Sequence, residues 1–283
     1  MLSLHTNNAS LSAQNSIAKT QSQLSTSMTR LSTGYRINSA MDDAAGLQIA
    51  TRLKAQTSGM TVAMSNTQNS TSLLQTAEGA FAEVTNMLVR MKDLATQAAD
   101  ASSNAADKTA MQAEYDALGL ELSNVMNNTT FGGQKLLTGG TIATSMTFQI
   151  GAAKSETMSI NLSSAMSAVG SALSSAAANF NAAAVGTELT SNANAAIGSL
   201  VSAIDSISTV RSALGAAANR LDHVNSNLSN IATNTKAATG RIMDVDFATE
   251  SSNMTSSQML LQAGTAMLKQ SNSMSSMVMS LLQ

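Results

Sequence analysis

The side chains best suited to catalysis or metal binding are few in this sequence and far apart. Its 283 residues include no cysteine and only two histidines, His5 and His223. Neither histidine lies in a His-Glu-x-x-His pattern, and no carboxylates cluster beside them, as a zinc site would require. The lack of cysteine excludes thiol nucleophiles, thiolate metal ligands and disulfides. We therefore expect no catalytic residues, no cofactor, no metal site and no enzymatic activity.

The acidic pair Asp42 and Asp43 is the next candidate, either for general acid-base chemistry or for binding a cation. Ser39 stands three positions before Asp42, and Ser-x-x-Asp is the spacing of a capping box at the start of a helix. We favour this structural interpretation, in which Ser39 and Asp42 cap the next helix.

One polar stripe could bind another molecule. Arg90, Leu94 and Gln97 step by four and three residues, on a face about 100° from the neighbouring apolar positions that include Leu88 and Met91. For an isolated helix such a face would simply be solvated. We expect it to be open to a partner.

The composition indicates which elements position these residues. There is no proline, the aromatic content is 2%, and the net charge is −2. Proline breaks long helices, so its absence permits them almost everywhere. We expect no nucleic-acid partner because there is no basic stripe, and no membrane partner because no run of about 20 apolar residues occurs. Export would require a dedicated apparatus, because no standard signal peptide is evident.

Apolar residues spaced alternately by three and four predict three interior helices. The first pattern runs through residues 60–98, the second through 111–125 and the third through 196–231. The two long patterns have similar lengths, so we expect a segment from each half of the chain to share one bundle.

Both ends of the chain carry similar heptad patterns, which we expect to be subunit-packing seams of a polymer. Their proposed packing residues are Ile17, Leu24, Met28 and Leu31 near the start, and Leu260, Met267, Met274, Met277 and Leu281 near the end.

Between the long helices the period changes from helix to strand. Met146, Phe148 and Ile150 alternate with polar residues, as do Met158 and Ile160 after Gly151, which predicts a β-hairpin. Residues 163–187 are mostly Ser, Ala, Asn and Gly, with too few large apolar residues for an independent core.

Two strings near the ends resemble the signature of bacterial flagellins. The first reads RLSTG-RINSA-DDAAGLQIA within residues 30–50, and the second includes RI, ATE, SNM and QAG within residues 241–264. The resemblance covers roughly residues 1–160 and 190–283, and identifies a short form with a minimal outer region, of polar or lateral type.

The resemblance implies a secreted, extracellular subunit of the flagellar filament, mainly α-helical and elongated. It implies a terminal coiled-coil inner core (1–40 and 250–283), a helical bundle with a β-hairpin (41–162 and 188–249) and a short variable surface segment (163–187). The expected partners are further copies of the chain, the flagellar export apparatus and an export chaperone, and hook-associated junction and cap proteins.

The resemblance also implies recognition by host immune receptors. Positions Leu88, Arg90, Leu94, Gln97 and Glu114 match those that flagellins use in subunit contacts and in binding a Toll-like receptor. Residues 29–50 resemble the peptide that plant immune receptors recognise.

Three alternatives remain open at this point. The related junction protein between hook and filament shares the terminal signatures but usually has a larger middle region. A secreted enzyme on a helical scaffold would need a nucleophile-base pair or metal ligands. A signalling coiled coil would need a membrane span or a sensory domain.

Overall fold

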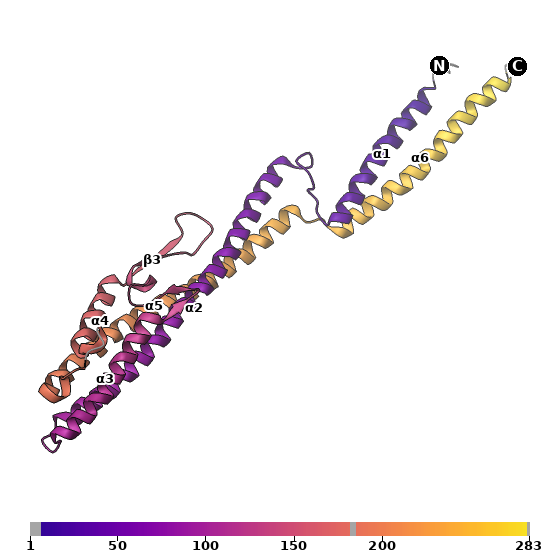
Figure 1. Ribbon diagram of the computed structural model, residues 1–283. Coiled ribbons are helices and arrows are strands. Elements are labelled where there is room, and N and C mark those ends of the chain that lie inside the picture. Colours follow the sequence, from indigo (N-terminus) through magenta and orange to yellow (C-terminus); the bar gives the residue numbers. More distant parts are fainter. Residues whose placement is uncertain (1–6, 182–184, 282–283) are drawn as a thin grey trace. The chain divides into compact units, whose positions relative to one another are not determined.

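The computed structural model describes residues 7–181 and 185–281 and is mainly helical, as predicted (Figure 1). The chain divides into two compact units, one from residues 1–57 and 233–283 and one from residues 58–232. Two long helices, α2 (Ala44–Ala99) and α5 (Glu188–Met243), contribute to both units.

In the first unit, α1 (Asn8–Thr33) packs against α6 (Phe247–Leu281), so the two ends of the chain form one helix pair. The helices run antiparallel, because Asn7 donates a hydrogen bond to Ser271 at one end and Arg30 approaches Glu250 at the other. Figure 1 shows the N- and C-termini at the same end of this pair. The predicted pairing of the chain ends is confirmed.

A short backbone pairing joins the segments that leave α1 and enter α6. Gly34 ends α1 with φ 76°, a left-handed conformation that glycine adopts without a steric penalty. The Val245 N–H then donates to the Gly34 carbonyl at 3.0 Å, and the Arg36 N–H donates to Met243. These bonds form a single antiparallel bridge, Tyr35 to Asp244.

The cap of α2 differs from the prediction. The Asp42 carboxylate accepts the Ser39 N–H at 2.9 Å and the Asn38 N–H at 3.0 Å. The bond from Ser39 is one of the two hydrogen bonds expected of the capping box. The helix begins at Ala44, however, and the Asp43 carboxylate accepts the Gly46 N–H at 2.8 Å. Asp43 is therefore the N-cap. The Ser39–Asp42 pair closes the turn before it.

In the second unit α2 and α5 bury their predicted apolar positions against each other. Every position of the α2 seam is buried, and Phe81 is fully enclosed. The seam positions are Met60, Ala63, Thr67, Ser70, Leu74, Ala77, Phe81, Val84, Leu88, Met91, Ala95 and Ala98. In α5 the seam is buried from Ala196 to Leu221 and at Leu228, while Val224 is half-buried and Ile231 is exposed. By length and composition alone α5 could cross a membrane. Its buried seam in the core accounts for that apolar character.

The helix predicted over residues 111–125 is α3 (Ala105–Asn128), and it begins with a capping box. The side chains of Asn104 and Asp107 each accept a hydrogen bond from the other residue's backbone N–H. Tyr115 and Leu122 are buried in the core shared with α2 and α5. A short hairpin follows, in which β1 (Thr130–Phe131) pairs with β2 (Gln134–Lys135). The chain turns between them through Gly132 and Gly133, both of positive φ.

The predicted β-hairpin is present as β3 (Ser145–Gln149) and β4 (Thr157–Asn161). The strands are antiparallel, with Met146 opposite Ile160 and Phe148 opposite Met158. Met146, Met158 and Ile160 are buried and the alternate residues are exposed, so one face of the hairpin covers the core. The 3₁₀ turn η1 (Thr141–Ala143) precedes it.

Residues 163–187 contribute more to the core than their composition indicates. They form α4 (Ser163–Ala176) and the 3₁₀ turn η2 (Ala178–Phe180). The packing residues of α4 are all part of the main core: Met166, Val169, Leu173 and Ala176. Their spacing of three, four and three is the signal that could have identified this helix from sequence.

Candidate interaction surfaces

The seam between α1 and α6 consists of small and medium-sized residues. The least exposed residues of α1 step by three and four, as do those of α6. Gly264 lies so close to Ile17 that a Cβ there would be 2.9 Å from the Ile17 Cγ1. The two series are Ser10, Ala13, Ile17, Thr20, Leu24, Ser27 and Leu31 in α1, and Glu250, Met254, Ser257, Leu261, Gly264, Leu268 and Ser271 in α6.

The seam predicted for α6 is not the one that packs against α1. Leu260, Met267, Met274 and Met277 are all more than half exposed, and Leu281 lies beyond the side chains that the structure describes. The sequence carries two heptad series one residue apart, which places them about 100° apart on the helix. Periodicity detects both series equally, and only the position of α1 shows which one is covered.

The residues predicted to pack between subunits in α1 are divided between two faces. Ile17, Leu24 and Leu31 are half-buried against α6 of the same chain, whereas Met28 is 50% exposed on another face.

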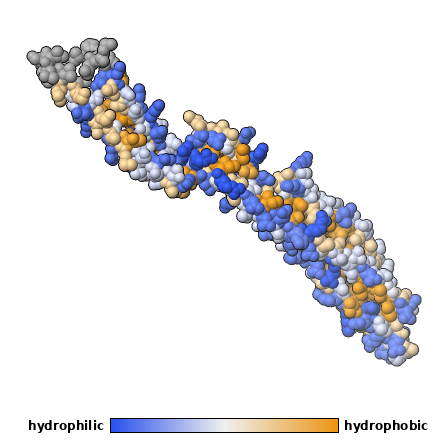
Figure 2. Space-filling view, turned by 180° about the vertical axis from the view of Figure 1, so that it is seen from behind, coloured by the Kyte–Doolittle hydropathy of each residue, from blue (hydrophilic) through white to orange (hydrophobic). Residues whose placement is uncertain are grey.

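The uncovered face of α6 carries an apolar stripe, which we call the α6 stripe and define as Met259, Leu260, Met267, Met274 and Met277. At 100° per residue these five side chains fall within an arc of about 100°. Their exposed fractions lie between 54% and 70%. Residues 251–283 contain one charged side chain, Lys269. Figure 2 shows hydrophobic side chains on the surface of this helix pair, beside the chain ends drawn in grey.

A partly buried charge cluster joins the other end of the helix pair. Arg30 lies 3.7 Å from Glu250 and 3.8 Å from Asp42, and Glu250 is only 8% exposed. Backbone N–H donors of Ser39 and Asn38 lower the pKa of Asp42, and Arg30 adds to the effect. The cluster holds α1, α6 and the turn before α2 together. Sequence reasoning gave Arg30 and Glu250 no role, because no local pattern links two residues so far apart.

The predicted stripe on α2 is only partly a surface. Arg90 and Gln97 are exposed, but Leu94 is 3% exposed and belongs to the core. Leu88, which the resemblance had added to the receptor contacts, is 0% exposed. The buried arc of α2 is wider here than one heptad seam, since Met87 and Leu94 are covered as well as Leu88 and Met91. Arg90 donates through Nε and Nη2 to the Glu114 Oε1, at 2.9 and 2.7 Å.

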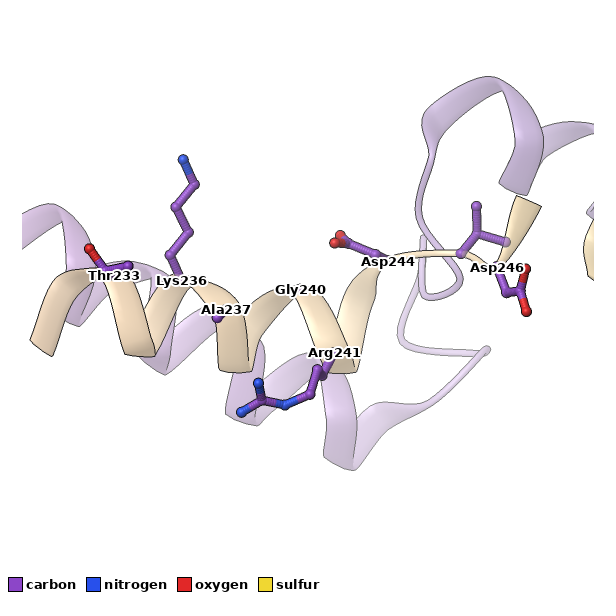
Figure 3. Close-up of a pocket in the computed structure, with 8 residues that line it drawn as sticks. Thr233, Lys236, Ala237, Gly240, Arg241, Asp244 and Asp246 are labelled. Atoms are coloured by element: carbon purple, nitrogen blue, oxygen red, sulfur yellow. The ribbon is translucent and has the colours of Figure 1, made fainter. Parts of the chain in front are cut away.

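A groove lies along the end of α5, lined by Thr233, Lys236, Ala237, Gly240, Arg241, Asp244, Val245 and Asp246 (Figure 3). The Lys236 and Arg241 side chains extend to opposite sides of the helix, so their charges do not converge. Within residues 7–181 and 185–281, no three His, Asp or Glu side chains are grouped to hold a metal ion. His223 lies on α5 without such a group, and His5 lies outside the described residues.

Comparison with protein families gives two matches. The bacterial flagellin N-terminal helical region matches residues 4–141, and the bacterial flagellin C-terminal helical region matches residues 197–282. The chain is 33% identical to Flagellin A of Vibrio cholerae, over all of both chains, in an alignment of 379 positions. It is also 34% identical to Flagellin FlaB2 of Treponema pallidum over 98% of each chain.

One solved structure supports the fold. A putative flagellar hook-associated protein from Vibrio parahaemolyticus has a TM-score of 0.56 at 16% identity, covering 72% of this chain and all of the other. Flagellin of Bacillus cereus is 30% identical over 62% of this chain and 94% of its own, with a TM-score of 0.47. With two terminal helices paired, long interior helices and full-length flagellin relatives, the chain belongs to the bacterial flagellin family and is a structural, non-enzymatic subunit of the flagellar filament.

Proposed function

We propose that the α6 stripe packs against neighbouring copies of this chain in the filament. Its exposure carries the proposal: five large apolar side chains lie together on a helix face that almost lacks charge. Exposed apolar groups of this kind mark association surfaces. Burying each Met or Leu contributes roughly 1.5 to 3 kcal/mol, and the contact repeats in every subunit. The segments 1–40 and 250–283 then form the inner core, and residues 163–187 lie nearer the outside.

The test is a charge placed in the stripe. Met267 is 70% exposed, so Met267→Lys should leave the fold of the subunit intact. In a packed interface the same ammonium group would be buried without a partner, which is costly. We expect Met267→Lys to prevent filament growth, whereas the matched control Met267→Leu should assemble. Electron microscopy and sedimentation measure assembly, and circular dichroism checks the fold. Normal filaments from Met267→Lys would refute the proposal.

The remaining partners follow from the filament role. We propose that the chain is exported through the flagellar export apparatus with an export chaperone and is extracellular once assembled. Hook-associated junction and cap proteins would contact it at the two ends of the filament, a proposal supported by the fold shared with the hook-associated protein.

We further propose that a smaller patch than expected is recognised by the Toll-like receptor, namely Arg90, Gln97 and Glu114. These side chains are exposed, and the Arg90–Glu114 ion pair fixes two of them in place. We leave Leu88 and Leu94 out of the proposed patch because their side chains are buried. Residues 29–50 remain the segment proposed for plant receptors.

A second ion pair provides the control for this patch. Arg211 binds Glu78 with the same geometry, at 3.2 and 2.7 Å. Arg90→Ala should weaken receptor activation by monomeric protein in a reporter-cell assay, and Arg211→Ala should not. Equal activation by both variants would show that the patch is not the receptor site.

A further inference from the structure

The most exposed and the most buried methionines lie in different units. The chain has 19 methionines. Within the described side chains, every methionine that is at least half exposed lies in the unit formed by residues 1–57 and 233–283. Every buried methionine lies in the unit formed by residues 58–232. The exposed group is Met28, Met41, Met259, Met267, Met274 and Met277, and the buried group is Met60, Met87, Met91, Met126, Met146, Met158 and Met166.

Four of the six exposed methionines belong to the α6 stripe. A thioether is oxidised according to its accessibility, and the product, methionine sulfoxide, is polar and chiral where the original side chain was apolar. In this protein the solvent-accessible thioethers are therefore concentrated on the α6 stripe, the face proposed to be buried in the filament. Leucine would provide the same apolar surface without this sensitivity.

We propose that the α6 stripe is an oxidation site for hydrogen peroxide, and that its oxidation blocks addition of the subunit to the filament. The inference rests on the proposed packing role of the stripe. A sulfur lone pair attacks one oxygen of the peroxide, and the O–O bond breaks. The attacked oxygen stays on sulfur and releases its proton, which the second oxygen takes up as it leaves as water. Sulfur loses two electrons and peroxide gains them. Assembled subunits are protected because the stripe is covered.

The outcome at each methionine can be measured directly. Unassembled subunits and filaments are treated with hydrogen peroxide, quenched with free methionine, digested and analysed by mass spectrometry. In subunits, Met259, Met267 and Met274 should oxidise at least about tenfold faster than Met91, Met126 and Met158, following their exposure. In filaments the stripe should become as slow as the buried group. Stripe oxidation that is equally fast in subunits and filaments would overturn the proposal.

The functional outcome needs a variant without the sulfur atoms. We expect oxidised wild-type subunits to stop elongating filaments. Subunits in which all four stripe methionines are replaced, Met259→Leu/Met267→Leu/Met274→Leu/Met277→Leu, should still elongate them after the same treatment. Met41→Leu is the matched control, because Met41 is 97% exposed but lies outside the stripe, and it should remain sensitive. If oxidised wild type assembles normally, or if the fourfold variant loses assembly as the wild type does, the switch is wrong. Met267→Lys tests the packing role separately, without oxidant.

Discussion

The contact between Gly119 and Asn179 allows a quantitative test of how the second unit is packed. Gly119 lies on α3, and a Cβ there would overlap the Asn179 side-chain oxygen and lie 3.0 Å from its Cγ. Asn179 has little room to move, because it is 3% exposed and its amide donates to the Asp116 carbonyl at 2.6 Å. We therefore predict that Gly119→Ala destabilises this unit relative to an alanine placed in open space.

Two opposing effects set the magnitude. Alanine in a helix is favoured over glycine by about 0.5 to 1 kcal/mol, while overpacking a core costs about 1 to 3 kcal/mol. Gly198 on α5 is a matched reference, since a Cβ there meets nothing within 4 Å. The propensity gain cancels between the two variants. Gly119→Ala should therefore be less stable than Gly198→Ala by about 1 to 3 kcal/mol, or roughly 2 to 12 °C in Tm for a unit of this size.

Thermal unfolding followed by circular dichroism or calorimetry measures this difference. Adding Asn179→Ala removes the overlapping side chain, so Gly119→Ala should then become neutral or stabilising, a coupling that a double-mutant cycle detects. If Gly119→Ala raised Tm as much as Gly198→Ala, the close packing of η2 on α3 would be wrong.

Three further outcomes follow from individual side chains. Burial, together with the nearby Glu188 and Asp116 charges, raises the pKa of Tyr115, so an ultraviolet titration should find Tyr115 still protonated at about pH 10. The stability that Tyr115 contributes should be lost as pH rises above about 10, where the unfolded chain deprotonates first. Phe81→Ala should lower the free energy of unfolding by about 3 to 5 kcal/mol, measured by denaturant titration, because Phe81 is fully enclosed. Hydrogen bonds from Thr249 and Ala248 lower the pKa of Asp246 at the start of α6, so the stability that the Asp246 carboxylate contributes is present above about pH 4 and lost as pH falls below it. In a series of unfolding curves at different pH, Asp246→Asn should reduce this loss of stability in acid.

The sequence determined the elements that depend on local periodicity. The seams of α2 and α5 and the strand alternation around Gly151 could be predicted, because the period of a helix or strand appears directly as the spacing of apolar residues in the sequence. The terminal signatures also determined the family.

Tertiary structure decided which of several possible faces is covered. In α6 two heptad series lie side by side, and contact with α1 buries the one with the smaller residues and leaves the methionines exposed. In α2 the core buries Leu94, which a single-helix projection had placed on a surface, and Leu88, which the family resemblance had placed in a receptor epitope. The pairing of Arg30 with Glu250 joins residues distant in sequence. Periodicity gives the angle between side chains on one helix, but which of those angles faces a neighbour depends on helices contributed by other parts of the chain.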